Sequence, residues 1–171
     1  MEEKMVVEES EIEGLGVFAT AQIKKGEIIC FMLGEEMTVE KVMEMYDSGE
    51  EREGDPFQID SRSYINLEKP YVYINHCCEP NAGIRGKNEL IALQDIEKGE
   101  EITYDYSTTE ASDDEFWGDD YEAWSMECFC GSEICRGLIE EFKFLPEDVK
   151  MKYIGLKVLP GHIVKRFNLS L

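Results

Sequence analysis

The hydrophobic residues of this chain fall into short runs that are separated by glycine-containing turns. Each run is rich in β-branched or aromatic residues, or alternates apolar and polar residues, as short strands do. These runs occupy residues 5–9, 28–33, 57–60, 64–67, 90–93 and 101–106. Because no helical crossovers connect these runs, the pattern predicts a mainly β fold with a few short helices, built from small antiparallel sheets.

Two segments have the signals of helices instead. In Thr38–Tyr46 the apolar residues recur at helical spacing, Thr38 is a candidate N-cap, and Gly49 follows the expected end. Near the C-terminus, Pro146 is suited to the first helical position, and the segment to about Tyr153 is predicted to be a helix that Gly155 closes.

Length and charge narrow the possibilities further. The 171 residues suffice for one domain with a real core, and an apolar content of 43% indicates a folded protein. The formal net charge of -21 excludes a nucleic-acid binder that works by neutralising phosphates, and it favours a basic protein partner. The acidic residues could equally serve solubility alone.

The sequence shows neither a signal peptide nor a run of 18 apolar residues. We therefore expect a soluble intracellular protein without a membrane partner, located in the cytoplasm or, in a eukaryote, in the nucleus.

Residues 110–127 carry eight acidic residues and no Lys or Arg. Such a stretch is usually a solvated linker. Aromatic residues alternate with the acids, however, and would also suit docking of a basic peptide: Phe116, Trp117, Tyr121 and Trp124.

The six cysteines indicate a metal site. Cys128, Cys130 and Cys135 lie close together in a chain without a signal sequence, which favours metal binding in a reducing compartment over disulfides. A structural zinc site needs four ligands, so a fourth must come from elsewhere. Cys77 and Cys78, which follow His76, are both candidates, whereas Cys30 is expected to be a small core residue.

Four segments, in this order, resemble the SET-domain protein lysine methyltransferases that carry a post-SET zinc segment: Gly14–Ala19, Asn75–Asn81, Gly99–Tyr106 and Cys128–Gly137. The resemblance implies a SET-domain (β-clip) fold with a pseudoknot. It divides the chain into a SET domain at 1–109 with a variable insert at about 36–56, an acidic loop at 110–127, a post-SET zinc segment at 128–144 and a C-terminal helical extension at 145–171.

The resemblance also assigns ligands. It makes Cys78 the fourth zinc ligand beside Cys128, Cys130 and Cys135. It implies that S-adenosylmethionine is bound by residues of three of the segments, namely Gly14, Leu15, Gly16, Asn75, His76, Tyr106 and Phe129, with Leu138 as a further adenine contact.

Tyr106 matches the catalytic tyrosine of the family, and Tyr104 lies two residues away on the same face of the expected strand. In the family, a tyrosine at the position of Tyr104 favours addition of a single methyl group. One departure is Met32, which stands where relatives often carry a third active-site tyrosine.

The resulting hypothesis is a protein-lysine N-methyltransferase that depends on S-adenosylmethionine and contains one structural zinc ion. Its expected substrate is a basic protein, of which a histone is one candidate, and its expected main product is monomethyl-lysine. A catalytically silent SET-fold module that binds basic tails is the alternative. A zinc-ribbon-like adaptor is a further one.

Overall fold

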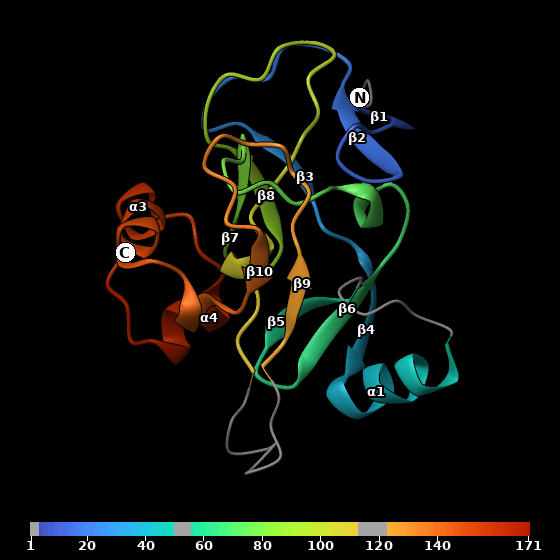
Figure 1. The fold of residues 1–171 in the computed structure, drawn as a ribbon, viewed down its shortest axis with the longest axis vertical. Helices are drawn as coiled ribbons and strands as arrows, with labels where there is room; N and C mark the ends of the chain where they lie inside the picture. The colour runs from blue at the N-terminus through green and yellow to red at the C-terminus, as the bar shows by residue number, and fades with distance from the viewer. Residues whose placement is uncertain (1–3, 50–55, 113–122) are drawn as a thin grey trace.

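The computed structural model describes residues 4–49, 56–112 and 123–171, and it consists mainly of short antiparallel strands (Figure 1). Its strands are β1 (Met5–Glu9), β2 (Leu15–Ala19), β3 (Ile28–Phe31), β4 (Gly34–Thr38), β5 (Phe57–Asp60), β6 (Ser63–Leu67), β7 (Ala82–Arg85), β8 (Glu89–Ala92), β9 (Ser125–Glu127) and β10 (Leu138–Glu140). Its helices are α1 (Val39–Ser48), α3 (Glu147–Leu156) and α4 (Gly161–Arg166), with 3₁₀ turns η1 (Tyr71–Tyr73), η2 (Tyr106–Thr108) and η4 (Phe142–Phe144).

The strands form four small sheets. β1 pairs with β2 and β9 pairs with β10, while the two larger sheets have the orders β3-β8-β7 and β4-β6-β5. All of these pairings are antiparallel. The predicted mainly β class with few helices is therefore confirmed.

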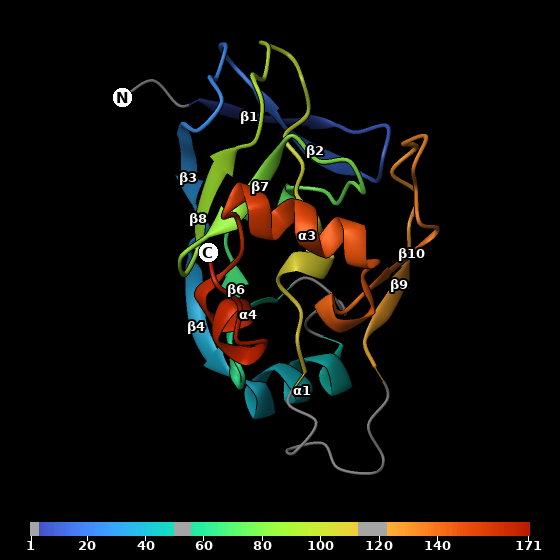
Figure 2. The ribbon, with the colours of Figure 1, turned by 90° about the vertical axis from the view of Figure 1, so that its left-hand side faces the viewer.

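One hydrophobic cluster lies between the sheets that surround the central part of the chain. Its fully buried members include Val17 of β2, Ile84 of β7 and Leu90 of β8. A second cluster, in which Ala111 joins Phe142, Tyr153 and other residues near the C-terminus, packs α3 and α4 onto the domain. In Figure 2, α3 crosses in front of the sheets, with α4 and α1 below it.

The local signals of α1 are confirmed. Thr38 Oγ1 accepts a hydrogen bond from the Lys41 N–H, and Gly49 adopts a left-handed φ of 72° while its N–H bonds to the carbonyls of Met45 and Tyr46. An N-cap hydroxyl and a left-handed C-terminal glycine satisfy backbone groups that the helix leaves without partners.

The predicted end of the C-terminal helix is wrong. Pro146 lies one residue before α3, and the helix continues through Gly155 to Leu156, where Lys157 takes a left-handed φ of 57°. Glycine inside a helix costs only about 1 kcal/mol, which the packing of Tyr153 in the second cluster can offset.

The strand predicted at 101–106 is also only partly present. The backbone pairs with β2 at Glu101 and with His76 at Tyr104, and Tyr106 already begins η2. Between Glu101 and Tyr104, the Thr103 N–H donates to the Asn81 side chain and the Thr103 carbonyl accepts the Ala82 N–H. The segment therefore changes its hydrogen-bonding neighbour every two or three residues. Consequently no single ladder extends along it.

Among the described residues, no helix combines the length and the apolar character needed to cross a bilayer.

Candidate functional site

Two segments that are far apart in the sequence lie side by side at the centre of the site. The Tyr104 N–H donates to the Asn75 carbonyl at 3.3 Å, and the Cys77 N–H donates to the Tyr104 carbonyl at 3.2 Å. This parallel pairing places Asn75 and His76 next to Tyr104 and Tyr106. Two of the four segments of the resemblance are thus brought into direct contact.

The Asn75 side chain ties this centre to the β1–β2 turn. Its amide Nδ2 donates to the carbonyl oxygens of Glu13 and Leu15, at 3.2 and 3.1 Å, and to Glu101 Oε1 at 2.8 Å. The same Glu101 carboxylate accepts hydrogen bonds from Ser10 Oγ at 2.8 and 2.9 Å. Glu101 therefore holds both Asn75 and the start of the turn in place.

His76 is buried and neutral. Burial lowers the pKa of His76 to about 4, although the nearby Asp105 acts in the opposite direction. Its Nδ1 accepts the Tyr106 N–H at 3.1 Å, so the single ring proton of the neutral form resides on Nε2. Nε2 lies 3.3 Å from Cys78 Sγ and therefore donates to that sulfur.

The rings of the two predicted tyrosines lie side by side at a tilt of 43°. Their ring centroids are 4.8 Å apart, and the Tyr106 ring also packs edge-on against His76 at 5.4 Å. The Tyr106 hydroxyl donates to the Ile74 carbonyl at 2.8 Å, which fixes its orientation. Tyr104 is buried and packs against Phe57.

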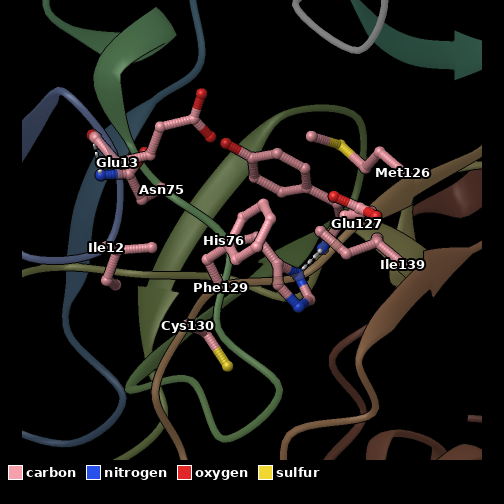
Figure 3. A pocket seen from close by; sticks show the side chains of 10 residues that line it. Ile12, Glu13, Asn75, His76, Met126, Glu127, Phe129, Cys130 and Ile139 are labelled. Carbon is pink, nitrogen blue, oxygen red and sulfur yellow. Dashed lines mark hydrogen bonds between the residues drawn. The ribbon is translucent and has the colours of Figure 1, made fainter.

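A pocket opens beside Tyr106 and encloses about 290 Å³ of space, part of which is open to solvent. Figure 3 shows Glu13 and Asn75 on one side of it and Glu127 on the other. The remaining lining residues are Ile12, His76, Tyr106, Met126, Phe129, Cys130 and Ile139.

Four of the predicted cofactor residues line this pocket: Asn75, His76, Tyr106 and Phe129. Gly14, Leu15 and Gly16 do not line it, and this turn reaches the site through the hydrogen bond from Asn75 to the Leu15 carbonyl. Leu138 lines a separate groove together with Arg136 and Phe144.

Met32 lies in the hydrophobic core. Its side chain is fully buried in the cluster that also contains Tyr104. Its carbonyl accepts a hydrogen bond from Asn88 Nδ2 at 2.8 Å. The residue that stands in place of the third tyrosine of the family therefore serves packing.

The four predicted metal ligands form one cluster. The sulfur atoms of Cys78, Cys128, Cys130 and Cys135 all lie within 4.8 Å of one another. Cys128 Sγ is 3.7 Å from Cys78 Sγ and 3.6 Å from Cys135 Sγ. Four sulfurs at about 2.3 Å from a tetrahedral zinc ion would be about 3.8 Å apart, so the spacing suits zinc. It is far too long for disulfides.

The chemistry of the donors fits a cation as well. Burial raises the pKa of Cys78 to about 11, and burial raises that of Cys128 further still. Burial acts in the same direction on Cys130, but hydrogen bonds from the N–H groups of Cys78 and Ser132, together with those from the thiols of Cys128 and Cys135, outweigh it and lower the pKa of Cys130 to about 7. Four thiolates could share this space only with a positive ion among them.

The remaining two cysteines lie outside the cluster. Cys77 Sγ accepts the Glu79 N–H at 3.4 Å. Cys30 packs against the hydrophobic core, and burial raises its pKa to about 12, as expected for a core thiol.

Sequence reasoning missed two acidic residues of this site. Glu101 and Asp105 appeared only as parts of the strand expected at 101–106. Asp105 is 1% exposed and forms a two-pronged ion pair with Arg136, of the Cys128–Gly137 segment. Arg136 is the one basic residue of these two matched segments, but the sequence did not show which acidic residue it meets.

Comparisons with known proteins identify the family of this chain. A family model described as "SET domain" matches residues 14–107, more than half of the chain. The chain therefore belongs to the SET domain family, and the family expected from the motifs is confirmed.

Named relatives include the variant-silencing SET domain-containing protein of Plasmodium falciparum, 37% identical over 119 residues that cover 59% of this chain and 5% of that protein. The H3 lysine-4 specific histone-lysine N-methyltransferase of Schizosaccharomyces pombe is 31% identical over 144 residues, which are 76% of this chain and 14% of that protein. The histone-lysine N-methyltransferase trithorax of Drosophila melanogaster is 32% identical over 139 residues, 74% of this chain and 3% of that protein. The chain thus spans at most 14% of the length of these three relatives.

A solved structure shares the fold. It is a humanized mutant of the Chaetomium thermophilum Polycomb Repressive Complex 2 bound to an inhibitor, with a TM-score of 0.55 and 22% identity. The match covers 61% of this chain and 15% of that one.

Proposed function

We propose that this protein is an S-adenosylmethionine-dependent protein-lysine N-methyltransferase. The observation that carries the proposal is the fixed Tyr106 hydroxyl, which bonds to the Ile74 carbonyl at the edge of the pocket lined by Asn75 and His76. Relatives from fungi and from Drosophila that are named histone-lysine N-methyltransferases support the same activity.

The pocket offers groups that suit S-adenosylmethionine. Asn75 and His76 provide backbone and amide groups for its polar parts, and Phe129, which is 65% exposed, provides a flat apolar surface for the adenine. The carboxylates of Glu13 and Glu127 favour a positively charged ligand. When bound, the cofactor supplies a methyl group on a sulfonium centre that an amine can displace.

The residues around Tyr106 would prepare the lysine amine. A free lysine has a pKa of about 10.4, and an aromatic environment with little water disfavours the ammonium form. The Tyr106 hydroxyl hydrogen is engaged by Ile74, so its oxygen can accept an N–H of the incoming amine. In-line displacement then depends mainly on alignment, which such fixed groups provide.

The cysteine cluster would hold one structural zinc ion. Cys78 follows Asn75 and His76 in the chain, while Cys128, Cys130 and Cys135 come from the segment that contains Phe129. A zinc ion between them would fix Phe129 and Cys130 against the opposite wall of the pocket. Its role is therefore to assemble the cofactor site.

The substrate would be a lysine in a basic protein segment, with histones as first candidates because of the named relatives and the net charge of -21. A histone substrate would place the protein in the nucleus. The tyrosine at position 104 points to monomethyl-lysine as the main product. The aromatic residues Phe116, Trp117 and Tyr121 of the acidic loop, which were considered as a docking site, lie outside the described residues.

Two measurements test the proposal. Calorimetry with S-adenosylmethionine should show binding at one site per chain. Mass spectrometry of a histone H3 tail peptide that was incubated with the protein and S-adenosylmethionine should show added methyl groups. Binding of the peptide without methyl transfer, at any lysine, would instead support a silent SET-fold module, an alternative motivated by Met32 in place of a tyrosine. The Tyr106→Phe variant is the matched negative control.

A further inference from the structure

Asp105 connects three separate parts of the chain at one buried point. It lies between Tyr104 and Tyr106 and is 1% exposed. Arg136 Nη1 donates to Asp105 Oδ2 at 3.0 Å, and Arg136 Nη2 donates to Asp105 Oδ1 at 2.7 Å. The Tyr153 hydroxyl of α3 donates to Oδ2 at 3.0 Å.

Each partner fixes the carboxylate in a different way. A buried carboxylate requires an opposite charge and hydrogen bonds to all of its lone pairs. Arg136 supplies the charge through its guanidinium. Its backbone N–H donates to Cys78 Sγ of the cysteine cluster, at a nitrogen-to-sulfur distance of 3.4 Å. Tyr153 supplies a neutral donor, because burial and the adjacent Asp105 raise the pKa of its hydroxyl far above the physiological range.

The same carboxylate controls the backbone that carries Tyr106. Asp105 Oδ1 accepts the Ser107 N–H at 3.1 Å and so caps η2, whose first residue is Tyr106. A carboxylate that rotated away from Tyr153 would turn Oδ1 away from Ser107. The orientation of Tyr106 therefore depends on the groups that donate hydrogen bonds to the two carboxylate oxygens of Asp105.

We propose that Tyr153 is a positioning residue for methyl transfer, through which the C-terminal helix α3 holds the Asp105 carboxylate and thereby the Tyr106 backbone. This inference rests on the proposed function of Tyr106. It makes the C-terminal extension a part of the active-site architecture. Tyr153 itself does not line the pocket beside Tyr106.

We expect that the Tyr153 hydroxyl can be removed without undocking α3. Other contacts hold the end of the chain: the Gly161 N–H donates to the Gly86 carbonyl at 2.6 Å, and His162 Nε2 lies 2.7 Å from the Thr109 carbonyl. Val158 also packs against Gly83 of β7. Tyr153→Phe keeps the ring in its hydrophobic cluster and is therefore expected to fold.

A matched variant separates positioning from packing. Ile163 is fully buried in the same cluster as Tyr153, but it belongs to α4 and makes no hydrogen bond through its side chain. Ile163→Val should lower the melting temperature while leaving Asp105 with all of its partners. The full chain is used for every variant.

The test combines kinetics with amide hydrogen exchange. In Tyr153→Phe, we expect kcat to fall about tenfold while the KM for S-adenosylmethionine stays within about twofold, because alignment is lost rather than binding. Amides of residues 102–108 should exchange faster than in the wild type. Ile163→Val should retain kcat and the wild-type exchange of 102–108.

Two results would overturn the inference. One is wild-type exchange of residues 102–108 in Tyr153→Phe. The other is an equal change in exchange in Ile163→Val, which would show that Tyr153 acts through packing alone. Because exchange is measured without substrate, these results are informative even if the wild type fails to transfer methyl groups, which would count against the proposed function only.

Discussion

The carboxylate of Glu101 occupies the space in which a side chain at Gly16 would have to lie. The Ser10 hydroxyl, shared between the two carboxylate oxygens, and the Asn75 amide hold this carboxylate, so it cannot move aside without losing these hydrogen bonds. Glu101 thus connects the β1–β2 turn with the segment that precedes Tyr104 and Tyr106. Gly16 has a negative φ, and its role is to leave room for this contact.

Gly16→Ala should therefore displace Glu101 and release Asn75. Loss of hydrogen bonds to a charged group should lower the free energy of unfolding by about 1.5 to 3 kcal/mol. Weaker binding of S-adenosylmethionine should accompany this loss, since Asn75 lines the pocket. Denaturant unfolding and calorimetry measure the two effects.

Gly86→Asn is the control for this substitution. Gly86 has a φ of 64°, which asparagine tolerates, and an added Cβ there meets no atom within 4 Å. The free energy of unfolding of the Gly86→Asn variant should differ from that of the wild type by only a few tenths of a kcal/mol. Equal losses in both variants would mean that the contact of Gly16 with Glu101 has no special importance.

The cysteine cluster leads to a prediction about metal content. Purified protein should contain one zinc ion per chain, and Cys78→Ser should lose it and bind S-adenosylmethionine more weakly. Cys77→Ser, at the neighbouring position outside the cluster, should keep both properties. Elemental analysis and calorimetry measure them. Zinc lost from Cys77→Ser but kept by Cys78→Ser would show that Cys77 is the fourth ligand.

Removing the metal should also lower stability. Ligands from two distant segments meet at the cluster, so a chelator should lower the melting temperature of the wild type and leave that of Cys78→Ser unchanged.

Local signals in the sequence predicted local structure well. The strands at 5–9 and 57–60 have the predicted bounds, and Thr38 and Gly49 cap α1 as expected. Each of these signals depends on neighbouring residues only. By contrast, β9 and β10 have three residues each and become strands because they pair with each other across the cysteine segment. The sequence offers no alternation there to reveal them.

The strands β4 and β7 were missed for related reasons. β4 begins at Gly34, which was expected to end the preceding strand, and it forms because β6 pairs along its whole length. β7 contains Gly83, a weak strand former, and its glycine is needed because Val158 approaches closely there. Such requirements come from tertiary contacts.

The candidate site could be located from the sequence where the motifs themselves contain the side chains that meet. The resemblance named Cys78, Cys128, Cys130 and Cys135, and these sulfurs do come together. The partners of Glu101 and Asp105 could not be inferred, because Ser10 and Tyr153 lie 91 and 48 residues away from them.

The excess of acidic residues leads to a prediction about salt. If these residues attract a basic substrate, the KM for a histone H3 tail peptide should rise steeply with ionic strength while kcat changes little. Exposed charges are screened beyond about 8 Å at physiological salt, which explains the direction. A peptide with the same target lysine but glutamine at the other basic positions should show a flat response. A flat response for both peptides would assign the acidic residues to solubility.

His162 leads to a prediction about pH. Burial lowers its pKa below the ordinary value of 6.5, while the Thr109 carbonyl and Asp60 act in the opposite direction. Below pH 6.5 the unfolded chain therefore binds more protons at this residue than the folded protein does. Its contribution to stability is complete above pH 6.5 and is lost as the pH falls.

The loss should reach at most about 1.4 kcal/mol per pH unit. His76, whose pKa is also lowered, contributes in the same direction, so the comparison must isolate His162. His162→Gln keeps a donor for the Thr109 carbonyl and removes the titration. Between pH 7.5 and 5, the free energy of unfolding should fall less in this variant than in the wild type. Parallel curves would contradict the prediction.

The contact between Tyr104 and Tyr106 leads to a prediction about the number of methyl groups. The Tyr104 ring centroid lies 4.8 Å from that of Tyr106. We expect the Tyr104 hydroxyl to hold an ordered water near the amine. That water would occupy the space into which a methylated amine must rotate before a second transfer. Met32 is fully buried in the core, so it is not expected to widen this space. The wild type should therefore give mainly monomethyl-lysine.

Substitution separates the two hydroxyls. Tyr104→Phe should keep methyl transfer but move the product toward di- and trimethyl-lysine, because it releases the water and leaves room for rotation. Tyr106→Phe should lower kcat about 100-fold, since it removes the group that is fixed by Ile74 beside the pocket. Mass spectrometry of a peptide with one target lysine, sampled over time, distinguishes these outcomes. Trimethyl-lysine in early samples of the wild type would show that Tyr104 does not limit the product.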